Sequence, residues 1–249
     1  ELMKKMAPSQ FEDIIALIAL YRPGPLQSGM TDDFVKRKKD PKLVEYPDAA
    51  LKSTLEDTYG VIVYQEQVML ISQIIGGFDL PKADNLRKVM GKKDASKLPQ
   101  MGEDFVKGAL EKKFKKEFAQ KLFDQMSKFA EYGFNKSHSA AYAFVAYQTA
   151  YLKAHYPLEY MTAVLNSEKN KIESLVPYLK ECANMGIAIL PPNLNYSQMN
   201  FEVEKEGIRF GLSAIKNIGE ANLTQLLKER EENGPFASFL DFLSRVDVN

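Results

Sequence analysis

The chain has 249 residues, 45% hydrophobic and 27% charged, with a formal net charge of zero. This composition is typical of a soluble globular protein with enough core for one large or two modest domains. Cys182 is the only cysteine beside two histidines, which excludes a disulfide framework and a structural zinc site. The sequence has no uncharged apolar run of bilayer length and no secretory pattern, so we expect a cytoplasmic protein without a membrane partner.

The first 130 residues predict a succession of helices. Ser9 and Glu12 form a capping-box pattern that opens an apolar helix over Phe11–Leu20, and the Pro-Gly-Pro segment 23–25 ends it. Further helices are expected over Gln65–Ile75, over 81–91 and from about residue 99. The next helix carries an apolar stripe at helical spacing that we assign to the core: Phe118, Leu122, Phe123, Met126 and Phe129.

The pattern changes at Gly186. Helices near 140–155, 158–166 and 173–185 complete a mostly helical block before it. Residues 187–190 predict a short strand, and residues 201–203 and 208–210 alternate with period two around a turn, which predicts a β-hairpin. We therefore predict a mainly α fold in two domains, residues 1–185 and residues 186–249, the second a small α+β segment.

A polar turn separates two helices within the segment Tyr132–Tyr142, where the first helix stops at Gly133 and the next starts near Ser139. A serine at a helix start caps it, and the N–H groups left free there can face an anion. The alternative is that Ser137 and Ser139 only cap a core helix. If the free N–H groups do face an anion, the polar residues of the turn would form a phosphate cradle: Asn135, Lys136, Ser137 and His138.

Positive charge is concentrated in two parts of the chain although the net charge is zero. Residues 87–121 hold eleven basic and five acidic residues, and residues 36–39 are four basic residues in a row. Such runs are either solvated helix faces or surfaces for a polyanion such as nucleic acid. Four cations of the first run surround the end of the helix expected over 81–91: Arg87, Lys88, Lys92 and Lys93.

These four cations favour an anion site, such as one for a triphosphate, because Arg forks and Lys point charges neutralise phosphate oxygens. The dipole at a helix C-terminus repels anions, so the side chains have to act by themselves. The alternative is local pairing, since Asp84 lies three residues before Arg87 and four before Lys88. One carboxylate does not neutralise four cations, which favours the anion site.

The segment 215–223 resembles the hairpin of a helix-hairpin-helix module. Gly219 would permit the tight turn, and the helix that follows would present N–H groups to a DNA backbone phosphate, with Lys216 in the same segment. The alternative is an ordinary corner between two helices with the glycine at a cap.

Carboxylates in a pattern for metal catalysis are missing. Two-metal polymerase and nuclease sites need converging carboxylates. The sequence contains no Asp-x-Asp pair, and the adjacent Asp32 and Asp33 would point apart on regular structure. We therefore predict no catalytic and no metal-binding residue in this chain.

Four motifs occur in one order along the chain: Tyr21–Leu26, Tyr64–Met69, Leu86–Lys93 and Tyr132–Tyr142. With them the chain resembles the family of bacterial DNA polymerase III α subunits, the family C replicative polymerases, over nearly its whole length. The resemblance implies a multi-helix fingers domain followed by the start of a helix-hairpin-helix module. It also implies that the palm, with the catalytic aspartates, lies upstream. We expect the chain to be a piece of a longer protein.

The resemblance implies roles for several residues. In the family, basic side chains of the helix that matches Leu86–Lys93 contact the incoming deoxynucleoside triphosphate, which points to Arg87 and, less directly, to Lys88, where many members have a second Arg. Further candidates are Lys92, Lys93, Arg22 and the Asn135–Ser139 turn. The implied cofactor is Mg²⁺, held by the palm and not by this chain. The implied partners are primer-template DNA, the dNTP, the rest of the polymerase chain, and replisome subunits including a sliding clamp.

The leading hypothesis is the fingers domain of a replicative DNA-directed DNA polymerase, inactive by itself because the palm carboxylates are absent. The alternative is a non-catalytic helix-hairpin-helix DNA-binding module, which would ignore nucleotides and bind duplex DNA with a steep salt dependence. A helical protein-interaction scaffold would show neither behaviour.

Overall fold

A computed structural model describes residues 1–92, 96–130 and 132–246 of the chain. Lys93, one of the predicted site residues, lies outside them. The described residues form fourteen α-helices, short 3₁₀ turns and one three-stranded sheet, which confirms the mainly α fold. The chain packs as two compact units, unit 1 (residues 1–147) and unit 2 (residues 148–249). The division lies within helix α10, and the predicted boundary between residues 185 and 186 falls inside unit 2.

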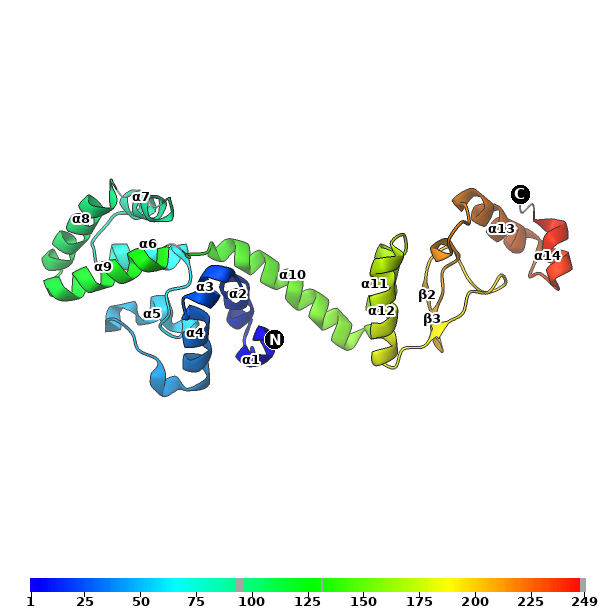
Figure 1. The fold of residues 1–249 in the computed structure, drawn as a ribbon, viewed down its shortest axis with the longest axis horizontal. Helices are drawn as coiled ribbons and strands as arrows, with labels where there is room; N and C mark the ends of the chain where they lie inside the picture. The colour runs from blue at the N-terminus through cyan, green and yellow to red at the C-terminus, as the bar shows by residue number, and fades with distance from the viewer. Residues whose placement is uncertain (93–95, 131, 247–249) are drawn as a thin grey trace. The chain divides into compact units, whose positions relative to one another are not determined.

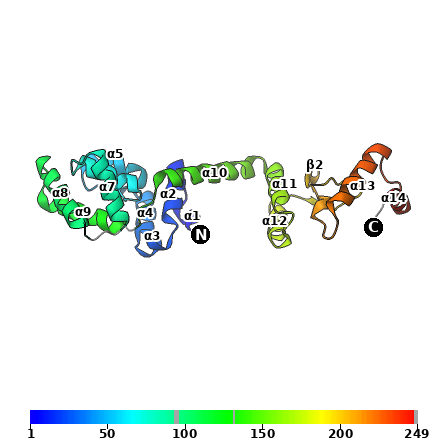
Figure 2. The same cartoon turned by 90° about the horizontal axis from the view of Figure 1, so that it is seen from above.

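Unit 1 is a group of short and medium helices with two hydrophobic clusters (Figures 1 and 2). The predicted helix over Phe11–Leu20 is confirmed, and the apolar stripe of α9 is buried except for Phe118, which is half-buried. The helices of this unit are α1 (Leu2–Met6), α2 (Phe11–Leu20), α3 (Pro23–Gln27), α4 (Met30–Lys39), α5 (Lys52–Leu55), α6 (Gln65–Ile74), α7 (Leu80–Gly91), α8 (Leu98–Glu111), α9 (Lys116–Ala130) and the first part of α10 (Lys136–His155).

The two clusters of unit 1 divide its helices. The larger cluster collects side chains of α6, α7, α8 and α9, and α8 and α9 lie side by side in both views (Figures 1 and 2). The smaller one joins α2 and α4 to Val63, Tyr64 and Ala143. The start of α6 and the first turns of α10 are therefore fixed against the N-terminal helices by apolar burial.

Asp13 organises the start of α2. Its buried carboxylate accepts hydrogen bonds from the backbone N–H of Ser9 (2.9 Å) and from the Tyr59 hydroxyl (2.8 Å), and it pairs with Lys38 at 2.9 Å. The predicted capping box of Ser9 with Glu12 is wrong, because the acid that folds back onto the chain before α2 is Asp13. Burial by itself raises the pKa of Asp13, but the hydrogen bonds it accepts outweigh burial and hold that pKa below its usual value.

Unit 2 begins with the second part of α10 and an antiparallel helix pair that covers a small sheet. Its elements are α11 (Pro157–Glu168), α12 (Ile172–Asn184), β1 (Ile189–Leu190), β2 (Glu202–Glu204), β3 (Gly207–Arg209), α13 (Glu220–Asn233) and α14 (Phe239–Arg245). The predicted hairpin is confirmed as the antiparallel pair β2–β3, and β1 adds to β3 in parallel, giving the order β1-β3-β2.

The core of unit 2 also has two parts. One joins α11 and α12 to the sheet around Leu165, Phe201 and Ile208, and it includes the fully buried Cys182. The other packs α13 and α14 around Leu223, Phe236 and Phe242. No helix in the described part of either unit is both long and apolar enough to cross a membrane.

Asp13→Asn is expected to lower the free energy of unfolding by about 3 kcal/mol, because Lys38 would keep its charge in a nearly buried position without an ionic partner. Urea denaturation near neutral pH measures this. The matched control is Asp32→Asn, which removes the ion pair with Lys5, whose side chains are both more than half exposed. The control should cost much less, because water and salt screen a pair of solvent-exposed charges.

Urea denaturation at acid pH gives a second measurement on the parent and the Asp13→Asn variant. The pKa of Asp13 in the folded chain is below the unfolded value of 3.8. The stabilisation by the ionised carboxylate is therefore complete above that value and is lost as the pH falls through the folded pKa. The stability difference between the parent and Asp13→Asn should shrink as the pH falls below 3.8. A difference that stays the same from neutral to acid pH contradicts this role of Asp13.

Candidate functional site

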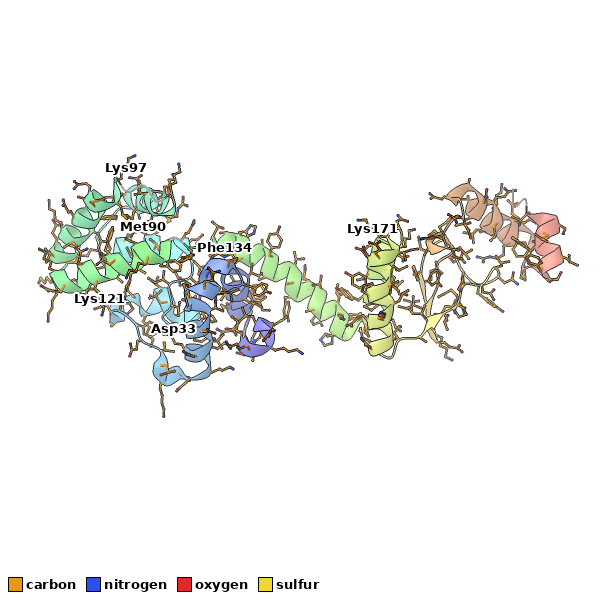
Figure 3. The ribbon with its side chains drawn as sticks, in the orientation of Figure 1. Asp33, Met90, Lys97, Lys121, Phe134 and Lys171 are labelled. Carbon is orange, nitrogen blue, oxygen red and sulfur yellow. The ribbon has the colours of Figure 1, made fainter. Side chains whose placement is uncertain are left out.

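The turn that joins α9 to α10 lies against the start of α6. Phe134 forms an isolated parallel bridge with the buried Tyr64. The backbone N–H of Gln65 donates to the carbonyl oxygen of Phe134 (2.9 Å), and the N–H of Phe134 donates to that of Val63 (3.3 Å). Figure 3 labels Phe134 at this turn. Two motifs that lie far apart in the sequence therefore meet through their backbones.

Gln65 extends this contact to α7. Its Nε2 donates to the carbonyl oxygen of Gly133 (3.2 Å), and its Oε1 accepts a hydrogen bond from Nη1 of Arg87 (3.1 Å). One amide side chain thus connects the basic helix to the polar turn. The structure brings together Arg87 and the 132–138 turn, as expected if both belong to one site.

Asp84 holds two of the four predicted cations. Nε and Nη2 of Arg87 donate to Asp84 at 2.9 and 2.8 Å, and Nζ of Lys88 pairs with it at 2.7 Å. The hydrogen bonds from Lys88 and Arg87 hold the pKa of Asp84 below its usual value. The local pairing considered as the alternative is therefore present. Lys92 is exposed and has no ion pair or side-chain hydrogen bond in the described part of the chain.

Helix α10 begins at Lys136, earlier than the start predicted near Ser139. Asn135 caps it, since its Oδ1 accepts a hydrogen bond from the backbone N–H of His138 (2.8 Å). Ser139 is fully buried, and its hydroxyl has no hydrogen-bond partner among the described residues. The alternative considered above, in which Ser137 and Ser139 only cap this helix, is therefore wrong.

The N-terminus of α10 already faces a carboxylate of the chain itself. The backbone N–H of Lys136 donates to both oxygens of Glu66, at 3.1 and 3.0 Å. Nζ of Lys136 lies 3.5 Å from Asp57. A helix N-terminus stabilises negative charge, and Glu66 supplies it here. A phosphate in the predicted cradle would have to displace Glu66.

Arg22 reaches the same turn from the connection between α2 and α3. Its Nε donates to the carbonyl oxygen of Ala19 (2.8 Å) and its Nη2 to that of Tyr132 (2.5 Å). The guanidinium lies over the ring of Phe134, 4.4 Å from its centroid. Burial lowers the pKa of Arg22. These contacts make Arg22 a support of the turn.

Aromatic rings continue from the turn onto the surface of α10. The rings of Phe134 and His138 are 5.5 Å apart, and those of His138 and Tyr142 are 4.7 Å apart. His138 is exposed, and 60% of Tyr142 is accessible to solvent. Tyr142 was not among the predicted site residues, although the spacing of four between it and His138 places both rings on one helix face.

Sequence reasoning also missed Glu66 as the partner of the α10 N-terminus. A signal existed, because Glu66 follows Gln65 in the motif that pairs with the turn, but no sequence pattern indicates which helix end a distant carboxylate will reach. Among the described residues, no group of three or more His, Cys, Asp or Glu side chains is placed to hold a metal ion. The residues described do not fit the Mg²⁺ that the resemblance implies for the polymerase.

The two remaining predicted residues, Lys216 and Gly219, belong to unit 2 and precede α13. Gly219 is the N-cap of α13 with φ −69° and ψ 143°, so its backbone is not left-handed. The left-handed residue of this turn is Asn217, with φ 64°. The predicted reason for the glycine is therefore wrong. A Cβ on Gly219 would meet no atom within 4 Å, so there is open space beside the N-cap of α13.

Comparisons with known protein families match a part of each unit. Residues 1–113 match the model of the bacterial DNA polymerase III alpha subunit finger domain, and residues 186–249 match a helix-hairpin-helix motif. The predicted resemblance is therefore confirmed: residues 1–113 are similar to the finger domain of bacterial DNA polymerase III α subunits, and residues 186–249 are similar to a helix-hairpin-helix motif. Residues 114–185 lie outside both matches.

Curated relatives extend the similarity to the whole chain. DNA polymerase III subunit alpha of Vibrio cholerae is 47% identical over 254 residues, which cover 100% of this chain and 22% of the relative. The proteins of the same name from Escherichia coli (46% identical, 100% and 22% covered) and Borreliella burgdorferi (49% identical, 99% and 21% covered) are similar to the same extent. The chain spans about a fifth of the length of these relatives.

Gln65→Ala is expected to lower the free energy of unfolding by about 1 kcal/mol or more, because the Gly133 carbonyl and the Arg87 guanidinium each lose a hydrogen bond. Urea denaturation measures the loss. The matched control is Gln73→Ala on the same helix, since the Gln73 side chain makes no hydrogen bond in the described part of the chain. Equal effects of the two substitutions would mean that Gln65 does not connect α7 to the turn.

Proposed function

We propose that unit 1 contacts the triphosphate of an incoming dNTP in a bacterial replicative DNA polymerase, using Arg87, Lys88 and Lys92. The observation that carries the proposal is the Gln65 side chain, which connects Arg87 to the turn before α10. Arg87 is thereby connected to the turn before α10, and the cations of α7 and the exposed rings of α10 would form one surface.

Asp84 has a defined part in this proposal. It pairs with both Arg87 and Lys88. A triphosphate offers several acceptor oxygens to the same guanidinium and ammonium groups, and a bidentate contact with Arg is stronger than a contact with one carboxylate oxygen. Binding is then a competition in which phosphate oxygens replace Asp84. Lys92, which has no internal partner in the described residues, is available without such an exchange.

The exposed rings suggest where a base would lie. His138 and Tyr142 are in ring contact on one face of α10, and the Arg22 guanidinium lies on the ring of Phe134 in the adjacent turn. Aromatic side chains stack on bases without regard to sequence. We propose that these rings contact the base or the template-primer beside the cations that hold the triphosphate. Asn135, Lys136 and Ser137 then act mainly by shaping the start of α10.

The complete reaction is proposed for the longer polymerase only. There the primer 3′-hydroxyl would be joined to the α-phosphate of the dNTP, with Mg²⁺ held by carboxylates outside this chain. The primer-template, the rest of the polymerase chain, a sliding clamp and other replisome subunits would be its partners. Because the sequence of this chain contains no Asp-x-Asp pair, we expect the 249-residue polypeptide to incorporate no nucleotide by itself.

Arg87→Ala is expected to weaken binding of Mg²⁺-dNTP about tenfold to a hundredfold, because a hydrogen bond to a charged group contributes about 1.5–3 kcal/mol. Asp84→Asn should strengthen binding, since the competing carboxylate is removed. Equilibrium dialysis with labelled dNTP measures both, and an incorporation assay on primed DNA accompanies it. Lys115→Ala, which removes an exposed lysine of the same unit, is the control.

Urea denaturation of each variant shows that folding is intact, and Arg87→Lys, which keeps the charge but loses the fork, should fall between the parent and Arg87→Ala. Nucleotide binding that responds to neither Arg87→Ala nor Asp84→Asn would overturn the proposed triphosphate contact. Incorporation by the 249-residue chain would contradict the assignment of catalysis to other segments.

A second function is proposed for unit 2, where the helix-hairpin-helix match covers residues 186–249. The turn at Asn217 and the open space beside the N-cap of α13 support binding of a DNA backbone phosphate without sequence readout. Lys216 is exposed beside this helix end. This unit would hold duplex or single-stranded DNA near the polymerase active site.

Lys216→Ala is expected to weaken DNA binding and to lower the slope of log K against log salt by about 0.9 for duplex DNA, the contribution of one phosphate contact. Fluorescence anisotropy with labelled DNA at several salt concentrations measures the slope. Lys228→Ala, at a lysine of α13 that pairs with Glu232, is the control. Identical slopes for the parent, Lys216→Ala and the control would exclude a phosphate contact by this hairpin.

A further inference from the structure

A cavity of about 690 Å³ lies between the α11–α12 turn and the segment that leads into the hairpin of unit 2. Figure 3 labels Lys171 at that turn. The charged groups in its lining are Lys169, Lys171, Lys216 and Glu173, an excess of two positive charges. A water molecule occupies about 30 Å³. The cavity therefore has room for a phosphate group together with several waters.

The lysines of this cavity are not neutralised by the chain. The side chains of Lys171 and Lys216 are exposed and make no hydrogen bond or ion pair with any described residue. Lys169 is half-buried, and its Nζ donates to Oδ1 of Asn200, a neutral acceptor. This differs from unit 1, where Asp84 holds both Arg87 and Lys88. Three ammonium groups line this cavity and none of them pairs with the Glu173 carboxylate, so they can form a site for an external anion.

The lysine at the N-cap of α12 also favours binding of an external anion at this cavity. Lys171 is the N-cap of this helix, and no side chain caps it. Helix stability favours Ser, Thr, Asp or Asn at an N-cap and negative charge near it. A lysine there works against the helix unless an anion lies close by. The backbone N–H groups of Ile172 and Glu173, which also line the cavity, have no acceptor among the described residues.

We propose that Lys169, Lys171 and Lys216 bind a phosphodiester group of the DNA strand that the hairpin contacts. The inference rests on the proposed DNA contact of the hairpin, because Lys216 belongs to both surfaces. It extends the DNA-binding surface to the α11–α12 turn, which lies outside both family matches. Phosphates follow one another along a strand, so two adjacent cationic surfaces fit successive positions of one backbone.

The test compares Lys171→Ala with Lys180→Ala, a substitution of an exposed lysine on the same helix outside the cavity. Fluorescence anisotropy of a short labelled DNA strand, alone and paired with its complement, is measured over a range of salt concentrations. Lys171→Ala should weaken binding several-fold and lower the slope by about 0.7 for single strands or about 0.9 for duplex. Lys180→Ala should leave both quantities unchanged.

Lys171→Ser separates binding from folding. Serine supplies the capping oxygen that α12 lacks, so the melting temperature should stay the same or rise. DNA binding should nevertheless weaken as it does for Lys171→Ala. A role of Lys171 in folding alone predicts the opposite result, with unchanged binding at equal stability.

The outcomes for the two surfaces are distinguishable. If Lys216→Ala lowers the salt slope and Lys171→Ala does not, the hairpin binds DNA and the proposed cavity site is overturned. If neither substitution changes the slope, both the cavity site and the proposed DNA contact of the hairpin are overturned. An equal loss with Lys171→Ala and Lys180→Ala would mean diffuse charge attraction, and it would also overturn the cavity site.

Discussion

The backbone bridge between Tyr64 and Phe134 fixes the part of unit 1 on which the candidate site depends. Buried N–H and carbonyl groups need partners, and here the start of α6 and the turn before α10 supply them to each other. Once the backbones are paired, the Gln65 side chain lies between the Gly133 carbonyl and Arg87. This contact fixes helix α7, which carries Arg87 and Lys88, relative to the face of α10 that carries His138 and Tyr142.

Internal carboxylates decide how each cationic surface can act. In unit 1, Asp84 forms ion pairs with Arg87 and Lys88. The Glu66 carboxylate accepts a hydrogen bond from the backbone N–H at the start of α10. An incoming phosphate therefore has to compete with these two carboxylates. Such competition favours a ligand with several negative charges over a single one. The cavity lysines of unit 2 have no comparable partners in the described residues. A polyanion can bind there without displacing a carboxylate.

The burial of Arg22 and the exposure of the His138 and Tyr142 rings indicate different roles for these residues. Arg22 donates to two backbone carbonyls and lies on Phe134, which makes it part of the framework. His138 and Tyr142, in contrast, expose their rings although both belong to a helix that starts in a packed region. Exposed aromatic rings contribute little to folding. The proposed contact of these two rings with a base rests on this exposure.

The amino-acid sequence by itself determined the helix content, the extents of most helices, the β2–β3 hairpin and the polymerase resemblance, because periodicity, proline, glycine and motif order are local properties of the chain. It did not determine which acid caps α2, where α10 starts, or that Asn217 takes the left-handed position instead of Gly219. Those outcomes depend on partners far away in the sequence. Only the tertiary structure decided that Glu66 meets the start of α10 and that Lys171 lines a cavity with Lys216, since side-chain pairing follows from packing.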